Sequence, residues 1–400
     1  MDSSILTFLF LIIIVTNSSA FKCNVTYPPT AIDCSSLGLH NLPDHLKDHI
    51  ATIMIFTHNK LDSNTTFNNW PNLRSIDISY NAITNITSQT FKSLINLKVL
   101  NISYNDVEEI SEDAFDGLKL LEVLDLSGNP QIGLDYGRLQ NLLNGTLYRS
   151  LKKLVMRSSE LHELPDTFFK HALELQHLDL SHNNLTHIPV LPDKLIHLDL
   201  SHNYITNIGI VPFHKKHSLR NIFLEYNVEL NNLDTDAFET AMNLKNISFK
   251  GCKNLSRLPP NLFYFNKNLK YLSIANCSLK TLPRQYRKTF STLSSLEIED
   301  NPWVCNTSIK WFLTLPPAII KNVRCQEPTN STILEFYGTS LHGAILHQLL
   351  LVLVILILIL FGLALYLSFV KEKKRRLDHP YVPLQGKHPL HNPVYITTVV

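Results

Sequence analysis

The sequence predicts an α/β repeat solenoid, in which successive coils each add one short strand to a shared parallel sheet, followed by a single transmembrane helix. Three features predict this class: a leucine-rich pattern that recurs mostly every 24 residues, an uncharged run near the C-terminus, and a shorter apolar run at the N-terminus. The period is examined first because repeat arrays do not follow the usual relation between chain length and number of domains.

The N-terminal segment MDSSILTFLFLIIIVTNSSA is typical of a secretory signal peptide. Its apolar run from Ile5 to Val15 is too short to span a bilayer, and Ser18 and Ala20 have the spacing of a signal-peptidase site. Asp2 stands where such signals usually carry a positive charge, so an uncleaved N-terminal anchor stays an alternative.

A second apolar segment predicts the membrane-spanning helix. The run from Leu349 to Val370 carries no charge and would form a helix of about 33 Å, enough to cross the hydrocarbon core. The KEKKRR cluster that follows indicates the cytoplasmic side, which predicts a type I protein of the plasma membrane. Ala364 and Ser368 could pack against a partner helix in a dimer, although one such pair is more often incidental.

The repeat places leucine-like residues and an Asn at fixed spacings that match L-x-x-L-x-L-x-x-N/C-x-L. Alternation within each copy predicts a short strand with one inward and one outward set of side chains. Because a single coil cannot bury its own leucines, the strands of successive coils should pair in parallel. Copies begin at Ala51, Leu73, Leu97, Leu121, Leu151, Leu175, Leu195, Leu219, Leu244, Leu269 and Leu293.

Two other side chains return once per coil. The Asn should turn inward at the end of each strand, where its amide can bond backbone groups that the bend leaves unpaired. A Phe farther along the coil predicts an aromatic stack under the convex side, and the segment QIGLDYGRLQ should bulge from the longest coil. The inward set is Asn59, Asn81, Asn105, Asn129, Asn183, Asn203, Asn227 and Asn301, with Cys252 and Cys277 at the same mark; the aromatic set is Phe91, Phe115, Phe169, Phe213, Phe238 and Phe263.

These repeats resemble the extracellular leucine-rich repeat family, with an ectodomain like that of Toll-like receptors but without their intracellular signalling domain. The resemblance covers Cys23 to about Pro328, and it implies a curved solenoid with its parallel sheet on the concave face and disulfide-stapled caps. AIDCSSLGLHNLP looks like the N-terminal cap, and NPWVCNTSIKWF with VRCQEP looks like the C-terminal cap. Each cap has fewer cysteines than is usual in the family, and the resemblance implies the bridges Cys23 to Cys34 and Cys305 to Cys325.

The remaining cysteines, Cys252 and Cys277, lie one coil apart at neighbouring strand ends. Stacked strands place equivalent Cα atoms about 5 Å apart, within the disulfide range, yet both Cβ vectors should point the same way. Two buried thiols are therefore the favoured expectation, and a bridge stays the alternative.

The expected organisation follows from the repeat, the caps and the apolar segments. It comprises a signal peptide (1–20), an N-terminal cap (21–50), about eleven repeats (51–300), a C-terminal cap (301–328), a juxtamembrane stalk (329–344), a transmembrane helix (345–370) and a cytoplasmic tail (371–400).

Sequons predict a glycosylated surface outside the membrane. Asn101 and Asn246 are the informative ones, because their places in the strands point them to the concave face; if both carry glycans, the open part of that face lies between them. Asn276 lies next to a buried strand end, so we expect some sequons to stay bare. The sequons outside the signal are Asn24, Asn64, Asn85, Asn101, Asn144, Asn184, Asn246, Asn254, Asn276, Asn306 and Asn330.

The open part of the concave face, called the window below, should present charged and aromatic side chains from neighbouring strands. Arg, Tyr and Phe are favoured anchors of protein interfaces, which makes the window the candidate site for a protein ligand. Every such solenoid has a concave face, however, and polar residues there need no ligand. The window comprises Lys153, Val155, Arg157, His177, Asp179, His182, His197, Asp199, His202, Phe223, Glu225 and Tyr226.

The duplicated LDLSHN places His, Asp and Ser close together in two coils, which is the inventory of a hydrolase triad. Alternate residues of a strand are about 7 Å apart, so His177, Asp179 and Ser181 should form a column rather than a triad. Histidines of adjacent coils could pair but give no closed tetrahedral zinc set. We therefore expect no enzyme, metal or cofactor, and keep the hypothesis that these histidines make the surface sensitive to pH between about 7 and 5.5.

The tail of about thirty residues is too short for a kinase or a signalling domain, but it contains short recognition motifs. NPVY looks like the signal read by phosphotyrosine-binding domains and endocytic adaptors, the last three residues look like a PDZ ligand, and YVPL resembles a weaker sorting signal. These motifs place the candidate tail residues at Tyr381, Asn392, Pro393, Tyr395, Thr398 and Val400.

The function that these features predict is a cell-surface receptor or adhesion protein that binds an extracellular protein through its solenoid and adaptors through its tail. A net charge of +2 without a basic face argues against a nucleic-acid partner. The alternative is a membrane-tethered structural or matrix glycoprotein without a signalling role.

Overall fold

The computed structural model describes residues 22–26, 31–46, 50–67, 70–134, 149–328 and 330–377. The expected signal peptide, the sequon Asn144 and the tail motifs from Tyr381 to Val400 lie outside these ranges. The chain divides between Phe336 and Tyr337 into two compact units, of which the first contains the repeats.

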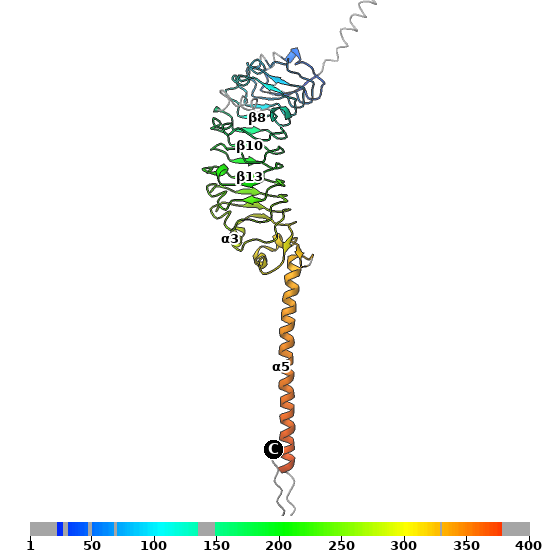
Figure 1. Ribbon diagram of the computed structural model, residues 1–400. Coiled ribbons are helices and arrows are strands. Elements are labelled where there is room, and N and C mark those ends of the chain that lie inside the picture. Colours follow the sequence, from blue (N-terminus) through cyan, green and yellow to red (C-terminus); the bar gives the residue numbers. More distant parts are fainter. Residues whose placement is uncertain are drawn as a thin grey trace, which may run out of the picture. The chain divides into compact units, whose positions relative to one another are not determined.

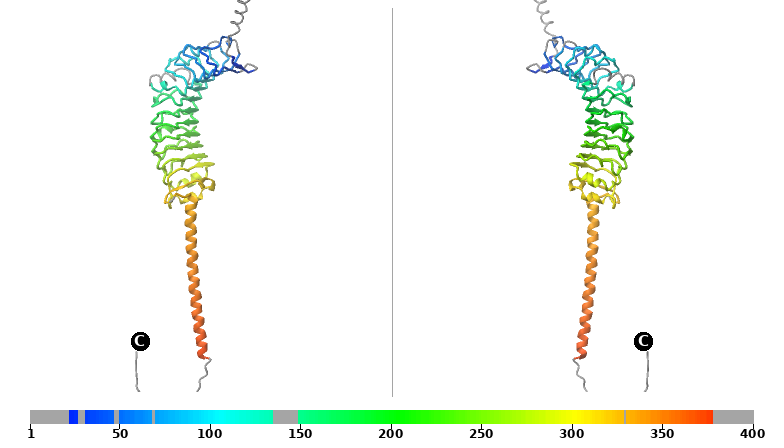
Figure 2. Two further views of the ribbon diagram at one scale, coloured as in Figure 1. Left: turned by 90° about the vertical axis from the view of Figure 1, so that its right-hand side faces the viewer. Right: turned by 90° about the vertical axis from the view of Figure 1, so that its left-hand side faces the viewer.

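Within the described ranges, thirteen strands form one continuous sheet on the concave face of a curved solenoid (Figures 1 and 2). The first, β1 (Asn24–Val25), runs antiparallel to β2 (Ala31–Asp33), and each later neighbour pairs in parallel. The predicted phase of the repeat is confirmed, because each of the next eleven strands begins two residues after a predicted copy. They are β3 (Ile53–Ile55), β4 (Ser75–Asp77), β6 (Val99–Asn101), β8 (Val123–Asp125), β9 (Lys153–Val155), β10 (His177–Asp179), β11 (His197–Asp199), β13 (Asn221–Phe223), β15 (Asn246–Ser248), β16 (Tyr271–Ser273) and β17 (Ser295–Glu297).

The rest of each coil is short and irregular. Two-strand ladders join β5 (Asn85–Ile86) to β7 (Glu109–Ile110), β12 (Asn207–Ile208) to β14 (Asn232–Leu233), and β18 (Trp303–Val304) to β19 (Cys325–Glu327). The helical segments are single turns or little more: η1 (Asp44–Leu46), η2 (Pro130–Ile132), η4 (Val211–Phe213), α3 (Tyr286–Phe290), η5 (Lys310–Thr314) and α4 (Pro317–Ile320). Of the segment expected to bulge, the structure describes only residues 131–134, of which the first two belong to η2.

The inward role predicted for the Asn residues is confirmed in every coil where one occurs. Asn227 is fully buried; its Oδ1 accepts a hydrogen bond from Ile205 N at 3.1 Å, while Nδ2 donates to the carbonyls of Leu200 and Leu224 at 3.0 and 2.9 Å. One amide thus bonds the backbone of its own coil and of the coil before it. The same pattern recurs at Asn59, Asn81, Asn105, Asn129, Asn183, Asn203 and Asn301.

Cys252 and Cys277 occupy the same mark as free, buried thiols, which agrees with the favoured expectation. Each Sγ donates to a carbonyl of the preceding coil at 3.2 Å, Leu224 O for Cys252 and Phe249 O for Cys277. Burial raises the pKa of both thiols, that of Cys277 to about 11, so both stay protonated and unreactive at neutral pH.

The aromatic stack predicted at the other side of the coils is present in two runs. Phe91 and Phe115 have ring centroids 6.3 Å apart, and Phe213, Phe238 and Phe263 follow one another at 5.1 and 6.0 Å. Phe169 packs against Phe168 instead, with centroids 4.8 Å apart. The sequence pattern missed two members: Phe67 extends the first run, and Tyr286 continues the second by an edge-on contact with Phe263.

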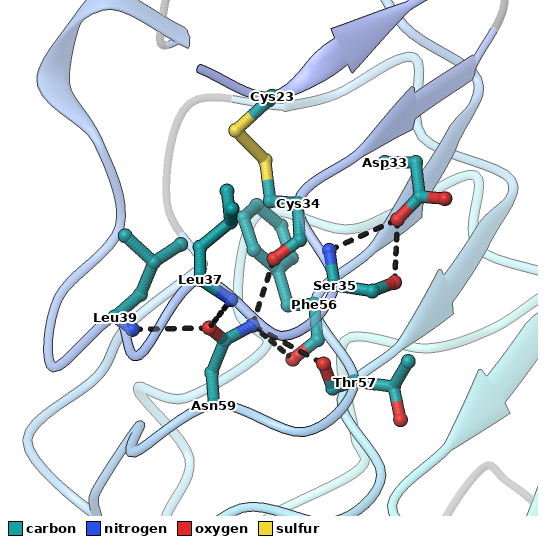
Figure 3. Close-up of a disulfide and its surroundings, with 9 residues drawn as sticks. All are labelled: Cys23, Asp33, Cys34, Ser35, Leu37, Leu39, Phe56, Thr57 and Asn59. Carbon is teal, nitrogen blue, oxygen red and sulfur yellow. Dashed lines mark hydrogen bonds between the residues drawn. A yellow bond between two sulfur atoms is a disulfide. The ribbon is translucent and has the colours of Figure 1, made fainter. Parts of the chain in front are cut away.

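Each cap contains one disulfide, and these are the two pairs that the family resemblance implies. Cys23 is bonded to Cys34, and Cys305 to Cys325, with Cα atoms 4.4 and 5.5 Å apart. The N-terminal bridge is tied to the first coil, because Asn59 Nδ2 donates to Cys34 O at 2.9 Å (Figure 3). The cap is therefore held both by a disulfide and by the hydrogen bonds of the first inward Asn side chain.

The described part of the second unit belongs to one long helix, α5 (Ile333–Leu377), whose first four residues lie in the first unit. Its stretch Gln348–Arg375 contains an 18-residue window with a mean hydropathy of 3.3, and is long and apolar enough to cross a membrane. The helix starts inside the expected stalk and continues beyond the expected inner end at Val370. No proline interrupts residues 333–377, so nothing in the sequence ends the helix at either expected boundary.

Replacing Asn227 by Ala should lower the free energy of unfolding by about 2–4 kcal/mol, because buried backbone groups of two coils lose their partner. The matched control is Asn243→Ala, which removes an exposed amide that donates to His217 O and should cost less than about 0.5 kcal/mol. Urea unfolding followed by circular dichroism measures the stability of both variants. Equal losses of stability would contradict the role assigned to the inward Asn residues.

Candidate functional site

The parallel register brings the predicted window residues together in rows across the sheet. At the first strand position, the partners of His177 are Lys153 on β9 and His197 on β11. At the third position, Asp179 and Asp199 lie side by side, and Phe223 follows on β13. The row beyond the strands contains His182, His202 and Tyr226. Four neighbouring coils therefore contribute to one surface.

The outermost row is a stack of rings. The centroids of His182 and His202 are 4.1 Å apart, and those of His202 and Tyr226 are 4.6 Å apart, with planes within 16° of parallel. All three residues have φ between 54° and 57°, in the left-handed region that non-glycine residues seldom adopt. The stack ends at Gly251, where an added Cβ would lie 2.5 Å from the Tyr226 ring. Only glycine leaves room for the ring there.

A second stack with the same design lies in the N-terminal coils, and sequence reasoning missed it. His58, Tyr80 and Tyr104 follow one another with centroids 4.3 and 4.5 Å apart, and this stack ends on Gly128. The signal was available: the residue before the Asn or Cys mark reads His, Tyr, Tyr, Gly in four successive coils, and His, His, Tyr, Gly in another four.

The acidic residues of the window are held in place by local bonds. Asp179 Oδ1 accepts hydrogen bonds from Ser181 N at 3.0 Å and Ser181 Oγ at 2.7 Å, and Arg157 Nε lies 3.8 Å from Asp179 Oδ2. The Asp77 and Ser79 pair makes the same two bonds in another coil. The Ser181 hydroxyl is thus directed to a carboxylate instead of an imidazole base, as the expected column requires.

Val155 differs from the rest of the window. It lies in the third row between Asp125 and Asp179, yet only 6% of it is exposed. The short side chain is covered by its longer neighbours, so it belongs to the packing of the sheet and offers a ligand little area. This corrects its inclusion among the contact residues.

Two imidazoles of the window, His177 and His182, have a lowered pKa. Partial burial, followed by His197 and Lys153, lowers the pKa of His177. Partial burial, followed by His202 and Arg157, lowers the pKa of His182, against the opposing effect of Asp199 and Asp179. The neutral form of His182 avoids repulsion with the Arg157 cation and with the His202 ring, whose centroid is 4.1 Å away.

Two sequon asparagines border the window, one at each end of it along the sheet. Asn101 on β6 and Asn246 on β15 are half-exposed, and their amides donate to Asp77 Oδ2 at 3.1 Å and Asn221 Oδ1 at 2.5 Å. The strands between them are β8, β9, β10, β11 and β13. Among the other described sequons, Asn24, Asn64, Asn254, Asn306 and Asn330 are exposed, while Asn85, Asn184 and Asn276 are half-buried.

Comparison with known proteins identifies the repeats. A leucine-rich repeat model matches residues 63–130 and 149–191, and the model of a BspA-type leucine-rich repeat region with six copies matches residues 193–307. No curated protein matches the sequence.

Solved structures with the same type of solenoid have low sequence identity to this chain. One, from an octameric complex of latrophilin 3, Unc5D and the leucine-rich repeats of FLRT2, has a TM-score of 0.50 and 22% identity, covering 78% of this chain and 95% of its own. Another, from a complex of TLR13 with the single-stranded RNA ssRNA13, has a TM-score of 0.39 and 20% identity, covering 71% of this chain and 56% of its own. By its repeats and its fold, the chain belongs to the leucine-rich repeat family.

Proposed function

We propose that the chain is a single-pass type I receptor or adhesion protein of the plasma membrane, and that it binds an extracellular protein through the window. The observation that carries this proposal is the single surface formed by β9, β10, β11 and β13, on which charged rows meet a stack of rings. Sequon asparagines stand on both sides of this surface and none stands within it.

The composition of the window favours a protein ligand. Arg157 and Tyr226 are exposed, Phe223 is half-exposed, and side chains of these types are enriched among residues that dominate binding energy. The ring stack holds its side chains in one arrangement before any ligand arrives, which reduces the entropy lost on binding.

Membrane topology is supported by features at both ends of the chain. Two disulfides and many sequons are typical of proteins exposed to an oxidising compartment. The end of α5 carries the cluster KEKKRR, which favours the cytoplasmic side. FLRT2, whose solenoid this one resembles in fold, is found in an assembly with two other proteins, which supports an extracellular protein partner.

Substitution of Arg157 and Tyr226 by Ala together should weaken binding of the extracellular partner by about ten- to a hundredfold. The partner is first identified by proximity labelling from the ectodomain on living cells, and its affinity is then measured with purified protein. Arg74→Ala with Tyr80→Ala is the matched control, because Tyr80 has the same left-handed backbone in the other ring stack. Loss of binding in the control pair, or none in the window pair, would refute the assignment.

The window should also respond to pH. Because the folded-state pKa values of His177 and His182 lie below 6.5, the unfolded chain takes up protons first as pH falls. Their contribution to stability is therefore complete above about pH 7 and is lost as pH falls through the lowered pKa values. The double variant His177→Gln with His182→Gln should show a smaller fall in Tm between pH 7.4 and 5.5 than the wild type.

The control for this measurement is His214→Gln, an exposed histidine outside the window. Partner affinity measured at the same two pH values extends the test from stability to function. If the double variant and the wild type depend equally on pH in both measurements, the histidines of the window are not the sensor.

For the tail, we propose that the NPVY sequence binds a phosphotyrosine-binding or endocytic adaptor and that the last three residues bind a PDZ domain. Tyr395→Ala should at least halve the rate of internalisation from the cell surface, whereas Val400→Ala should leave that rate unchanged and abolish capture by PDZ domains. Antibody uptake on living cells measures the first effect. Deleting residues 391–400 without changing localisation or turnover would favour a tethered structural glycoprotein instead.

A further inference from the structure

Three adjoining surface hollows line the coils between β14 and η5. The first, of about 300 Å³, extends from Asn232 to Pro260. The second, of about 310 Å³, shares Pro260 with the first, and shares Gln285 and Lys288 with a third of about 520 Å³ that reaches Leu315. Neighbouring hollows share lining residues and therefore adjoin one another; the three together are called the coil-end groove below.

This groove lies away from the window. Its central element, α3, begins thirteen residues after the end of β16 and ends five residues before β17, so it belongs to the part of the coil that returns behind the sheet (Figure 1). None of the ten sequon asparagines in the described ranges lines the groove. Glycans attached to those asparagines would therefore not start inside it.

The charge of the groove has one sign. The described lining residues include five cations and no carboxylate, and all five cations are exposed. None of the five forms an ion pair with another residue in the described part of the chain, and Lys267 Nζ instead lies 4.2 Å from the centre of the Tyr264 ring. The cations are Arg257, Lys267, Arg284, Arg287 and Lys288.

The middle hollow also offers groups that match hydroxyls and sugar rings. Tyr264 is 59% exposed at the same hollow, and Thr289 and Thr292 add hydroxyl groups.

We infer that the coil-end groove binds a linear, sulfated polysaccharide. A polymer fits the three joined hollows, and sulfate groups at intervals would meet the cations, because guanidinium groups bind tetrahedral oxyanions through paired hydrogen bonds. The sugar hydroxyls would find partners in Thr289 and Thr292, and a sugar ring could pack on the exposed Tyr264 ring. An acidic peptide would match the cations but would bring no comparable set of hydroxyl donors.

The test uses the full-length protein in nanodiscs of zwitterionic lipid, with heparin as the sulfated probe. Changing Arg284, Arg287 and Lys288 to Gln together should weaken heparin binding about tenfold, since each exposed charge pair contributes modestly. The control changes Arg74, Lys92 and Lys119 to Gln; these are also exposed and alter the net charge equally, but lie outside the groove. Wild-type affinity should fall as salt is raised, and the control variant should bind heparin like the wild type.

Three results would overturn the inference. The first is equal binding by the groove variant and the wild type, with circular dichroism showing that both are folded. The second is an equal loss in the control variant, which would reduce the effect to net charge. The third is binding of poly-glutamate as tight as that of heparin, which would assign the groove to acidic protein segments. Binding of the window's protein partner should persist in the groove variant, so the two sites fail independently.

Discussion

The hydrogen bonds of one amide per coil are the constraint on which the rest of this solenoid depends. Each strand is only three residues long in most coils, and the chain must then turn sharply enough to leave backbone groups unpaired. The Asn side chain bonds those groups in its own coil and in the preceding coil. It therefore ends the strand and sets the register between coils at the same time.

The same turn creates the surface that we assign to ligand binding. The residue before each Asn has a positive φ, as in His182 before Asn183 and Tyr226 before Asn227. This conformation accompanies the Asn side chain turning into the core while its predecessor lies on the surface, one coil spacing from the next. Where the predecessors are aromatic they stack, and where one is glycine the stack ends. Core bonding and surface presentation are two results of one backbone bend.

Some coils carry a weaker hydrogen-bonding side chain in place of the inward Asn, and a neighbouring coil then compensates. Ser159 replaces Asn in one coil, and its hydroxyl reaches Leu126 O at 3.4 Å and Arg157 O at 3.2 Å. The next amide adds a bond there, because Asn183 Oδ1 accepts from both Ser159 N and Leu161 N. The thiols of Cys252 and Cys277 are weak donors, yet each still reaches a carbonyl of the coil before it. Because neighbouring coils share these hydrogen bonds, the solenoid tolerates such substitutions.

Features that repeat with the coil were predictable from the sequence. Features that depend on the sizes of neighbouring side chains or on the lengths of the coils were not. Period alone placed the eleven parallel strands of the large sheet from β3 to β17, and the fixed mark identified Asn227 and its equivalents as inward. The burial of Val155 depends on the side chains beside it, and the alternation of inward and outward strand positions does not predict their effect. Phe67 and Tyr286 were not predicted, because Phe67 lies one coil before Phe91, the first phenylalanine of the predicted set, and Tyr286 differs in residue type. The coil-end groove combines four separate segments, so only the folded coils bring Lys267 and Lys288 to the same hollow.

The claim that the window is the contact surface can be tested most directly by histidine footprinting on living cells. Diethylpyrocarbonate modifies accessible imidazoles, and the chain offers four in the window, His177, His182, His197 and His202, beside exposed ones elsewhere, His162, His187 and His214. Modification is compared by mass spectrometry with and without the bound protein partner. The account predicts that the partner protects the four window histidines and leaves the other three as reactive as before. Protection confined to His162, His187 or His214 would contradict it.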